Sequence, residues 1–182
     1  MATSTANPQT AKVAPGATLT TGRQIVAFIE ALLLAVWIGS MIFFSFAVAP
    51  SAFSVLNDRE LAGRIVTSTI GKIEWIGLIS GPLLLLIQAT AWKGSALGGA
   101  AKVIRGVLLV LMTAMAALSK FWISAKMASL RIQMGGIENV PVDNPLRVEF
   151  NFLHQFSTSA MAVALLAGFA VLFLTVRSWL KR

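Results

Sequence analysis

Ionisable side chains occur within long apolar runs of this sequence, where they are costly unless they pair or serve a function. Glu30 lies inside the first apolar run, and Arg105 lies near the start of the third. Glu30 could bind a cation or relay protons. Alternatively, it forms a buried ion pair with Arg105 or with Lys102, which we expect at a similar depth. Glu74 lies near the opposite end of the second run. It could also have a function there, or it could simply be a carboxylate beside the lipid headgroups.

His154 is the single histidine and opens the last apolar run. Its polar neighbours at helical spacing are Asn151, Gln155 and Thr158. This cluster could bind a metal ion. A copper(I) site would join the imidazole to thioether sulfurs, which are soft ligands, from Met127, Met134 or Met161. The alternative is a histidine that is hydrogen-bonded at the membrane edge.

The sequence contains no cysteine, which excludes disulfides, thiolate metal sites, iron–sulfur clusters and cysteine nucleophiles. A haem held by two histidines is excluded within one chain. The sequence shows no zinc-ligand spacing, phosphate-binding loop, nucleophile elbow or paired-carboxylate motif. We therefore expect no enzymatic activity and no cofactor.

The composition indicates a lipid environment. Of the 182 residues, 57% are hydrophobic and 12% are charged, whereas a soluble domain carries about 25% charged residues. The formal net charge is +8, but the basic residues stand at the ends of apolar runs and form no patch with stacking aromatics. We therefore expect anionic lipid headgroups, and no nucleic acid, as partners of these charges.

Four apolar runs are close to the roughly 20 residues that cross a bilayer as a helix. These runs cover residues 25–49, 70–92, 103–119 and 150–176. An amphipathic pattern continues the third to about residue 134, where Gly135-Gly136 ends it. The sequence thus predicts an all-α polytopic membrane protein: a four-transmembrane-helix bundle over residues 23–182 with an extended third helix. Residues 1–22 are polar and are predicted to form a disordered tail.

The connection between the first two runs is predicted to hold a short helix of its own. We expect the first run to end at Pro50 and Asn57-Asp58 to cap the linking helix. Glu60 and Arg64 are four residues apart, a spacing that favours an ion pair on a helix surface. Arg64 could alternatively reach Glu74.

Charge distribution predicts the orientation. With four spans, both termini share one side with the loop between the second and third runs, and this side carries eight basic residues and no acidic one. The other side carries seven basic and six acidic residues. A short, wholly basic loop and C-terminus favour the cytoplasm. We therefore expect a bacterial inner-membrane protein with cytoplasmic termini.

Small residues predict close helix packing. Gly77 and Gly81 have the spacing that lets two membrane helices approach each other. This face could pack within the bundle or form a homodimer.

Several motifs resemble those of the transmembrane protein 205-like family. The segment Phe43-Phe44-Ser45-Phe46-Ala47-Val48-Ala49-Pro50 is similar to the end of that family's first helix, and Ala62-Gly63-Arg64 and Leu153-His154 fall at two further motifs. The resemblance extends over residues 24–178. It implies a compact four-helix membrane domain of unestablished role, distantly similar to copper-resistance membrane proteins. It also directs attention to Pro50, Arg64 and His154.

Two functions remain open from the sequence. The chain could handle metal ions, protons or small solutes along a polar path formed by Glu30, Arg64, Glu74 and His154, in which case these side chains should converge on one cavity. A complete path would then need a homodimer, because four helices are few. Alternatively, the chain is a membrane scaffold or accessory subunit of a larger complex, in which case the polar groups should pair off and leave a face for a protein partner.

Overall fold

The computed structural model describes residues 21–93 and 95–181, and all regular structure in these ranges is helical. Of the predicted N-terminal tail, only Thr21 and Gly22 lie within the described residues, where they belong to the first helix. The helices are α1 (Thr21–Phe43), η1 (Phe44–Val48), α2 (Ala49–Val55), α3 (Arg59–Thr90), α4 (Gly99–Leu118), η2 (Ser119–Ile123), α5 (Ser124–Met134), η3 (Ile137–Asn139) and α6 (Pro145–Leu180).

Within the described ranges, these segments form four helices that are long and apolar enough to cross a membrane. The third of them is continuous from Gly99 to Met134, a length of 36 residues. Gly135 then adopts a left-handed conformation (φ 66°), which ends the helix. The predicted all-α bundle with an extended third helix is thereby confirmed.

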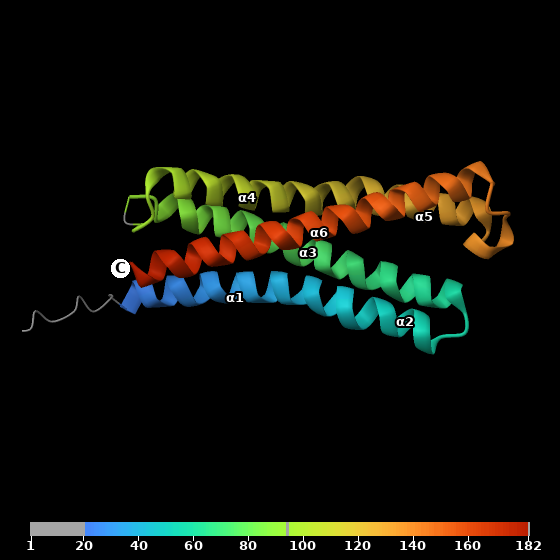
Figure 1. Cartoon of the computed structure of the whole chain (residues 1–182), viewed down its shortest axis with the longest axis horizontal. Coiled ribbons are helices and arrows are strands. Elements are labelled where there is room, and N and C mark those ends of the chain that lie inside the picture. The colour runs from blue at the N-terminus through green and yellow to red at the C-terminus, as the bar shows by residue number, and fades with distance from the viewer. Residues whose placement is uncertain (1–20, 94, 182) are drawn as a thin grey trace, which may run out of the picture.

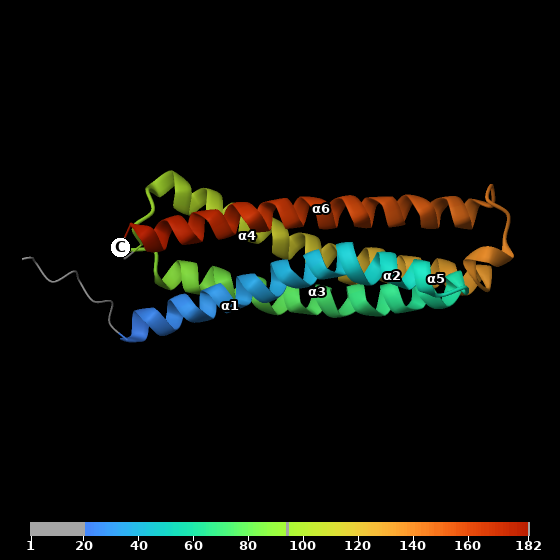
Figure 2. The ribbon, with the colours of Figure 1, turned by 60° about the horizontal axis from the view of Figure 1, so that its bottom comes forward.

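The four long helices run up and down side by side (Figures 1 and 2). The start of α1, the α3–α4 connection and the end of α6 lie together at one end, which we call the terminal end. The α2–α3 and α5–α6 connections lie at the opposite, distal end.

The prediction that the first helix ends at Pro50 is wrong, because the helix continues through α2 to Val55. Proline lacks an N–H, and its ring crowds the carbonyl one turn earlier. The π-helical segment η1 ends two residues before Pro50, and there the N–H of Ala49 bonds the carbonyl of Phe44, five residues back. This wider turn accommodates the proline ring without ending the helix.

The prediction of a separate linking helix is also wrong, because α3 runs without interruption from Arg59 to Thr90. Asp58 is the N-cap, as expected, and its carboxylate accepts hydrogen bonds from the N–H groups of Glu60 (2.8 Å) and Leu61 (3.0 Å). It therefore caps the second membrane helix itself. Glu60 pairs with Arg131 of α5 (Nε–Oε1 3.6 Å) and makes no ion pair with Arg64.

Two tryptophan–lysine pairs lie near the ends of the second apolar run. The Lys102 ammonium lies 5.7 Å from the ring centroid of Trp92, and the Lys120 ammonium lies 5.8 Å from that of Trp75. Trp75 lies in α3 and Trp92 two residues after its end, 17 residues apart, which is about 26 Å at the rise of a helix and close to the thickness of a bilayer core. Such amphipathic pairs are typical of the membrane interface. The chain between the two pairs is therefore long enough to cross a bilayer core.

The small-residue face of α3 packs inside the bundle. A Cβ atom at Gly77 would lie 2.9 Å from Nε1 of Trp37 on α1, and one at Gly81 would clash with Oγ1 of Thr113 on α4. These two glycines thus allow α3 to approach two neighbours, which is the intramolecular alternative. The core beside them includes Leu34, Trp37, Leu84, Leu109, Met112 and Val171.

Gly81→Ala is expected to lower the free energy of unfolding by about 1–3 kcal/mol, because the β-branched Thr113 cannot move away without disturbing α4. Gly39→Ala is the matched control, since a Cβ there meets no atom within 4 Å. The control should be neutral or slightly stabilising through helix propensity. Thermal unfolding of both variants in the same detergent measures the difference. Equal melting temperatures would show that the contact at Gly81 does not constrain the bundle.

Candidate functional site

A hydrogen-bonded cluster at the terminal end is built around Arg105. The guanidinium forms an ion pair with Glu30 through Nη2 and Oε1. Its Nε donates to Oγ1 of Thr175 (3.0 Å), and its Nη1 donates to Oε1 of Gln88 (2.7 Å). Nε1 of Trp179 donates to the second oxygen of Glu30 (3.3 Å). We call these five residues the Arg105 cluster.

The Arg105 cluster joins all four long helices, because its side chains come from α1, α3, α4 and α6. Glu30 and Arg105 are 7% and 4% exposed. Gln88 uses its remaining polar end to donate to the carbonyl of Lys102 (2.9 Å). The positive charge is thus paired with a negative one inside the cluster, and hydrogen-bond donors are paired with acceptors. These contacts hold the four helices together. This arrangement corresponds to the ion-pair alternative for Glu30.

A second buried carboxylate, Glu74, lies nearer the distal end. Its Oε1 accepts hydrogen bonds from the hydroxyls of Ser119 (2.5 Å) and Ser124 (2.8 Å). Its Oε2 is 3.6 Å from the ammonium of Lys120 and makes no hydrogen bond with the described residues. Glu74 is 5% exposed, so this charge depends on its three partners from the third helix.

The π-helical segment η2 explains how two serines reach one oxygen atom. Ser119 and Ser124 are five residues apart, which is about 140° around an α-helix, so they would point in different directions. η2 spans Ser119–Ile123, and its wider turn rotates Ser124 back toward the face of Ser119. The local helix geometry therefore builds the Glu74 site.

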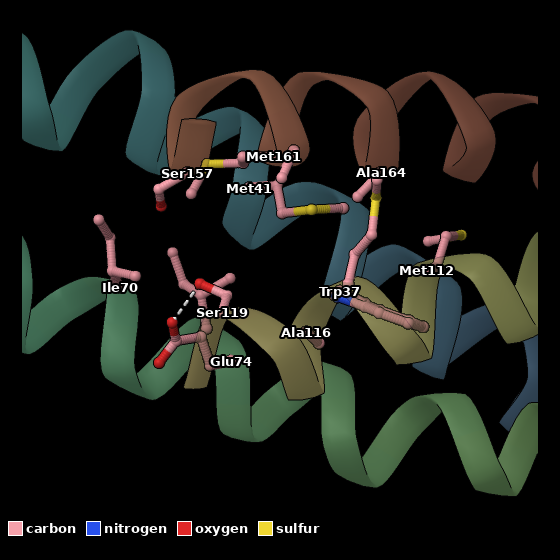
Figure 3. Close-up of a pocket in the computed structure, with 13 residues that line it drawn as sticks. Trp37, Met41, Ile70, Glu74, Met112, Ala116, Ser119, Ser157, Met161 and Ala164 are labelled. Atoms are coloured by element: carbon pink, nitrogen blue, oxygen red, sulfur yellow. Dashed lines mark hydrogen bonds between the residues drawn. The ribbon is translucent and has the colours of Figure 1, made fainter. Parts of the chain in front are cut away.

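Glu74 borders a small inner cavity with a volume of about 50 Å³. Figure 3 shows Ser157 and Met161 of α6 facing Glu74 and Ser119 across this space. Four thioethers are part of the wall, and the volume exceeds what one water molecule needs. The lining is Trp37, Met41, Ile70, Ile73, Glu74, Met112, Met115, Ala116, Ser119, Ser157, Ala160, Met161 and Ala164.

A much larger outer cavity, of about 700 Å³, occupies the distal end between α2 and α3 on one side and α5 and α6 on the other. It shares Ile70 and Ser157 with the inner cavity. The lining is Phe53, Arg59, Glu60, Gly63, Arg64, Val66, Thr67, Ser68, Ile70, Ser124, Met127, Ala128, Arg131, Ile132, Ile137, Glu138, Arg147, Phe150, Asn151, His154 and Ser157. The two cavities thus extend from the distal end toward the middle of the bundle.

The candidate residues from the sequence divide into two groups. Arg64, Asn151 and His154 line the outer cavity, and Glu74 lines the inner one. Glu30 and Arg105 belong to the separate cluster at the terminal end. The predicted single path through Glu30, Arg64, Glu74 and His154 is therefore interrupted between Glu74 and Glu30.

The predicted metal site at His154 has few possible ligands near it. Within the described residues, no group of three or more His, Asp or Glu side chains could hold a metal ion. The three candidate methionines are also dispersed: Met127 lines the outer cavity, Met161 lines the inner one, and Met134 packs in the distal core. Copper(I) binding by His154 stays a prediction.

Sequence reasoning did not single out several residues of these sites. Ser119 and Ser124 hold Glu74, Thr175 and Trp179 complete the Arg105 cluster, and Arg131 crosses from α5 to Glu60. Serine and threonine occur in membrane helices for many reasons, so type alone did not identify them. The sequence offered one signal for such partners, namely polar residues that are expected at the same depth in the membrane as Glu30 and Glu74.

These features define a polytopic membrane protein whose helices are joined at one end and enclose a cavity at the other. The model of the domain of unknown function DUF4149 matches residues 32–135, and the chain belongs to this family. The matched segment includes Glu74 with its three partners and also Arg64 and Arg105. No curated protein and no solved structure matches the chain.

Arg105→Leu is expected to lower the free energy of unfolding by about 3–5 kcal/mol, because Glu30 would remain buried without its counter-charge. The double variant Glu30→Leu/Arg105→Leu should recover much of this loss, because it removes both charges. Thermal unfolding of the three proteins in detergent measures the coupling. A double variant that is less stable than Arg105→Leu would contradict the role of charge pairing in this cluster.

Proposed function

We propose that this protein binds and handles a small solute in the two distal cavities. The supporting observation is the outer cavity of about 700 Å³, which falls within the usual range of ligand pockets. The polar residues Arg64, Asn151 and His154 line it, and Glu74 lines the inner cavity that adjoins it. A solute entering from the distal end would meet charged and apolar groups in turn.

The proposed path is open toward one membrane face only. Beyond the inner cavity, fully buried residues such as Leu34, Leu109 and Val171 fill the bundle, and the Arg105 cluster joins the helices below them. Passage to the other face would require these contacts to separate, or a second copy of the chain to complete the path. Solute binding from the distal face is therefore the first step of the proposal, and transport is its extension.

The alternative is a membrane scaffold or accessory subunit, with a homodimer or another membrane protein as partner. It is favoured by the Arg105 cluster, in which two of the candidate residues pair with each other. An accessory subunit needs no solute in the distal cavities. Water access to these cavities and solute binding in them therefore distinguish the two functions.

The proposal also includes the family resemblance, the kind of membrane and the orientation of the chain in it. Similarity to the transmembrane protein 205-like family rests on the motif that ends at Pro50, which here forms the π-helical segment and the proline-containing turn. We place the chain in a bacterial inner membrane with cytoplasmic termini, on the basis of the basic residues at the terminal end. The proposed activity involves no catalytic step and no cofactor.

The absence of cysteine from the sequence allows a direct test of water access. Ser157→Cys lies between the two cavities and should react with a membrane-impermeant methanethiosulfonate reagent that is added from the distal side of oriented vesicles. Ala167→Cys is the matched control on α6, because Ala167 is buried and lines neither cavity. It should remain unlabelled.

Asn151→Cys provides the positive control, since its side chain is exposed at the outer cavity. If Asn151→Cys reacts and Ser157→Cys does not, water does not reach the inner part of the cavity and the proposed path fails. If Ala167→Cys reacts as fast as Ser157→Cys, the protein is open throughout and the contrast between its two ends is wrong.

The proposed orientation predicts the behaviour of C-terminal reporter fusions in a bacterium. A green fluorescent protein fusion should fluoresce, because this reporter matures in the cytoplasm, and an alkaline phosphatase fusion should be inactive. The positive charges at the terminal end provide the physical reason. An active phosphatase fusion with a dark fluorescent fusion would reverse the topology and turn the distal cavity toward the cytoplasm.

A further inference from the structure

The basic residues at the distal end require an explanation beyond topology. Three of the seven form ion pairs: Lys120 with Glu74 (3.6 Å), Lys126 with Glu149 (3.2 Å) and Arg131 with Glu60 (3.6 Å). Arg59, Arg64 and Arg147 form no ion pair with any residue in the described part of the chain. All three line the outer cavity.

The charge of the outer cavity is therefore positive. Its lining contains four arginines and two glutamates, Glu60 and Glu138, so two positive charges are not matched within the wall. Glu60 is already close to Arg131. A cavity with this balance attracts anions and disfavours cations.

Two of the arginines are held in place by neighbouring groups. The guanidinium of Arg131 lies 5.6 Å from the ring centroid of Phe150 and against Gly63, where a Cβ atom would approach Nη2 to 2.9 Å. Nη1 of Arg147 donates to the carbonyl of Val140 (2.8 Å). Side chains that are positioned before binding lose less entropy when a ligand arrives.

Guanidinium groups suit one class of ligand in particular. Their planar N–H donors match the two oxygens of a carboxylate or phosphate. Beside them, Phe53, Val66 and Phe150 supply apolar wall. We propose that the outer cavity binds the phosphate or carboxylate group of an organic anion, with Arg64 as an open contact and Arg131 and Arg147 as fixed ones.

This inference rests on the proposed function, because it names the class of solute that the distal cavity accepts. Two kinds of molecule carry such an oxyanion, namely a lipid and a soluble solute. The cavity lies at the distal end of the bundle, where both a lipid headgroup and a soluble anion can reach it. A probe with an apolar chain and a probe without one separate these sources.

Binding can be measured with the full chain in a neutral detergent, using inorganic phosphate, dodecyl phosphate and, in nanodiscs, dioleoyl phosphatidate. Wild-type protein should bind at least one of these probes. Arg64→Gln should weaken binding about tenfold or more, as expected for the loss of a charge-assisted hydrogen bond. Arg177→Gln is the matched control, because Arg177 is an exposed arginine in the last turn of α6 at the terminal end.

Binding of inorganic phosphate that Arg64→Gln weakens supports the inference with a soluble source. Binding of only the two chain-bearing probes, with the same loss, supports it with a lipid source. The inference is overturned if no probe binds, or if both substitutions weaken binding equally, since general surface charge would then explain the result. Labelling of Ser157→Cys keeps the two proposals apart: a labelled cavity that binds no oxyanion removes this inference and leaves the proposed function standing.

Discussion

The buried guanidinium of Arg105 is the constraint on which the rest of the structure depends. A charge in the apolar layer must find partners within the protein, and here those partners come from each of the other three long helices. This requirement fixes which faces of α1, α3, α4 and α6 meet at the terminal end. Because the helices are joined there, a bundle of this length can diverge only toward the distal end, which is where both cavities lie.

The two π-helical segments adapt the same helices to a different set of neighbours toward the distal end. In the first helix, η1 permits the chain to continue past Pro50 and to form one wall of the distal end. In the third helix, η2 turns Ser124 toward Glu74 and leads into α5. Ile123 of η2 and Leu130 of α5 form a core with Leu153 of α6. The distal end thus has its own small core, and the outer cavity separates this core from the α2–α3 wall.

The sequence predicted what depends on length and hydropathy, and it missed what depends on side-chain direction. The four spans followed from apolar runs, and Arg105 was among the expected partners of Glu30 because both lie at one depth. Thr175 and Trp179 were not predicted, because the type of a residue does not show which side chains face one another across neighbouring helices. Glu60 was assigned to its local neighbour Arg64, whereas its partner Arg131 is distant in sequence. The π-helical turns leave no distinct residue pattern, so the continuation past Pro50 was also unpredictable.

The attachment of the helices at one end makes each of them a lever. Arg105 and Arg131 lie on the same continuous helix, 26 residues apart, which corresponds to about 39 Å. A tilt of about 5° around the Arg105 cluster would carry Arg131 sideways by about 3 Å over that length, while the buried ion pair itself would hardly move. The hydrogen bonds of Ser119 and Ser124 to Glu74 lie between these two arginines on the third helix. The aperture of the distal end can therefore change only if these bonds give way, so the Glu74 site limits the leverage of the third helix.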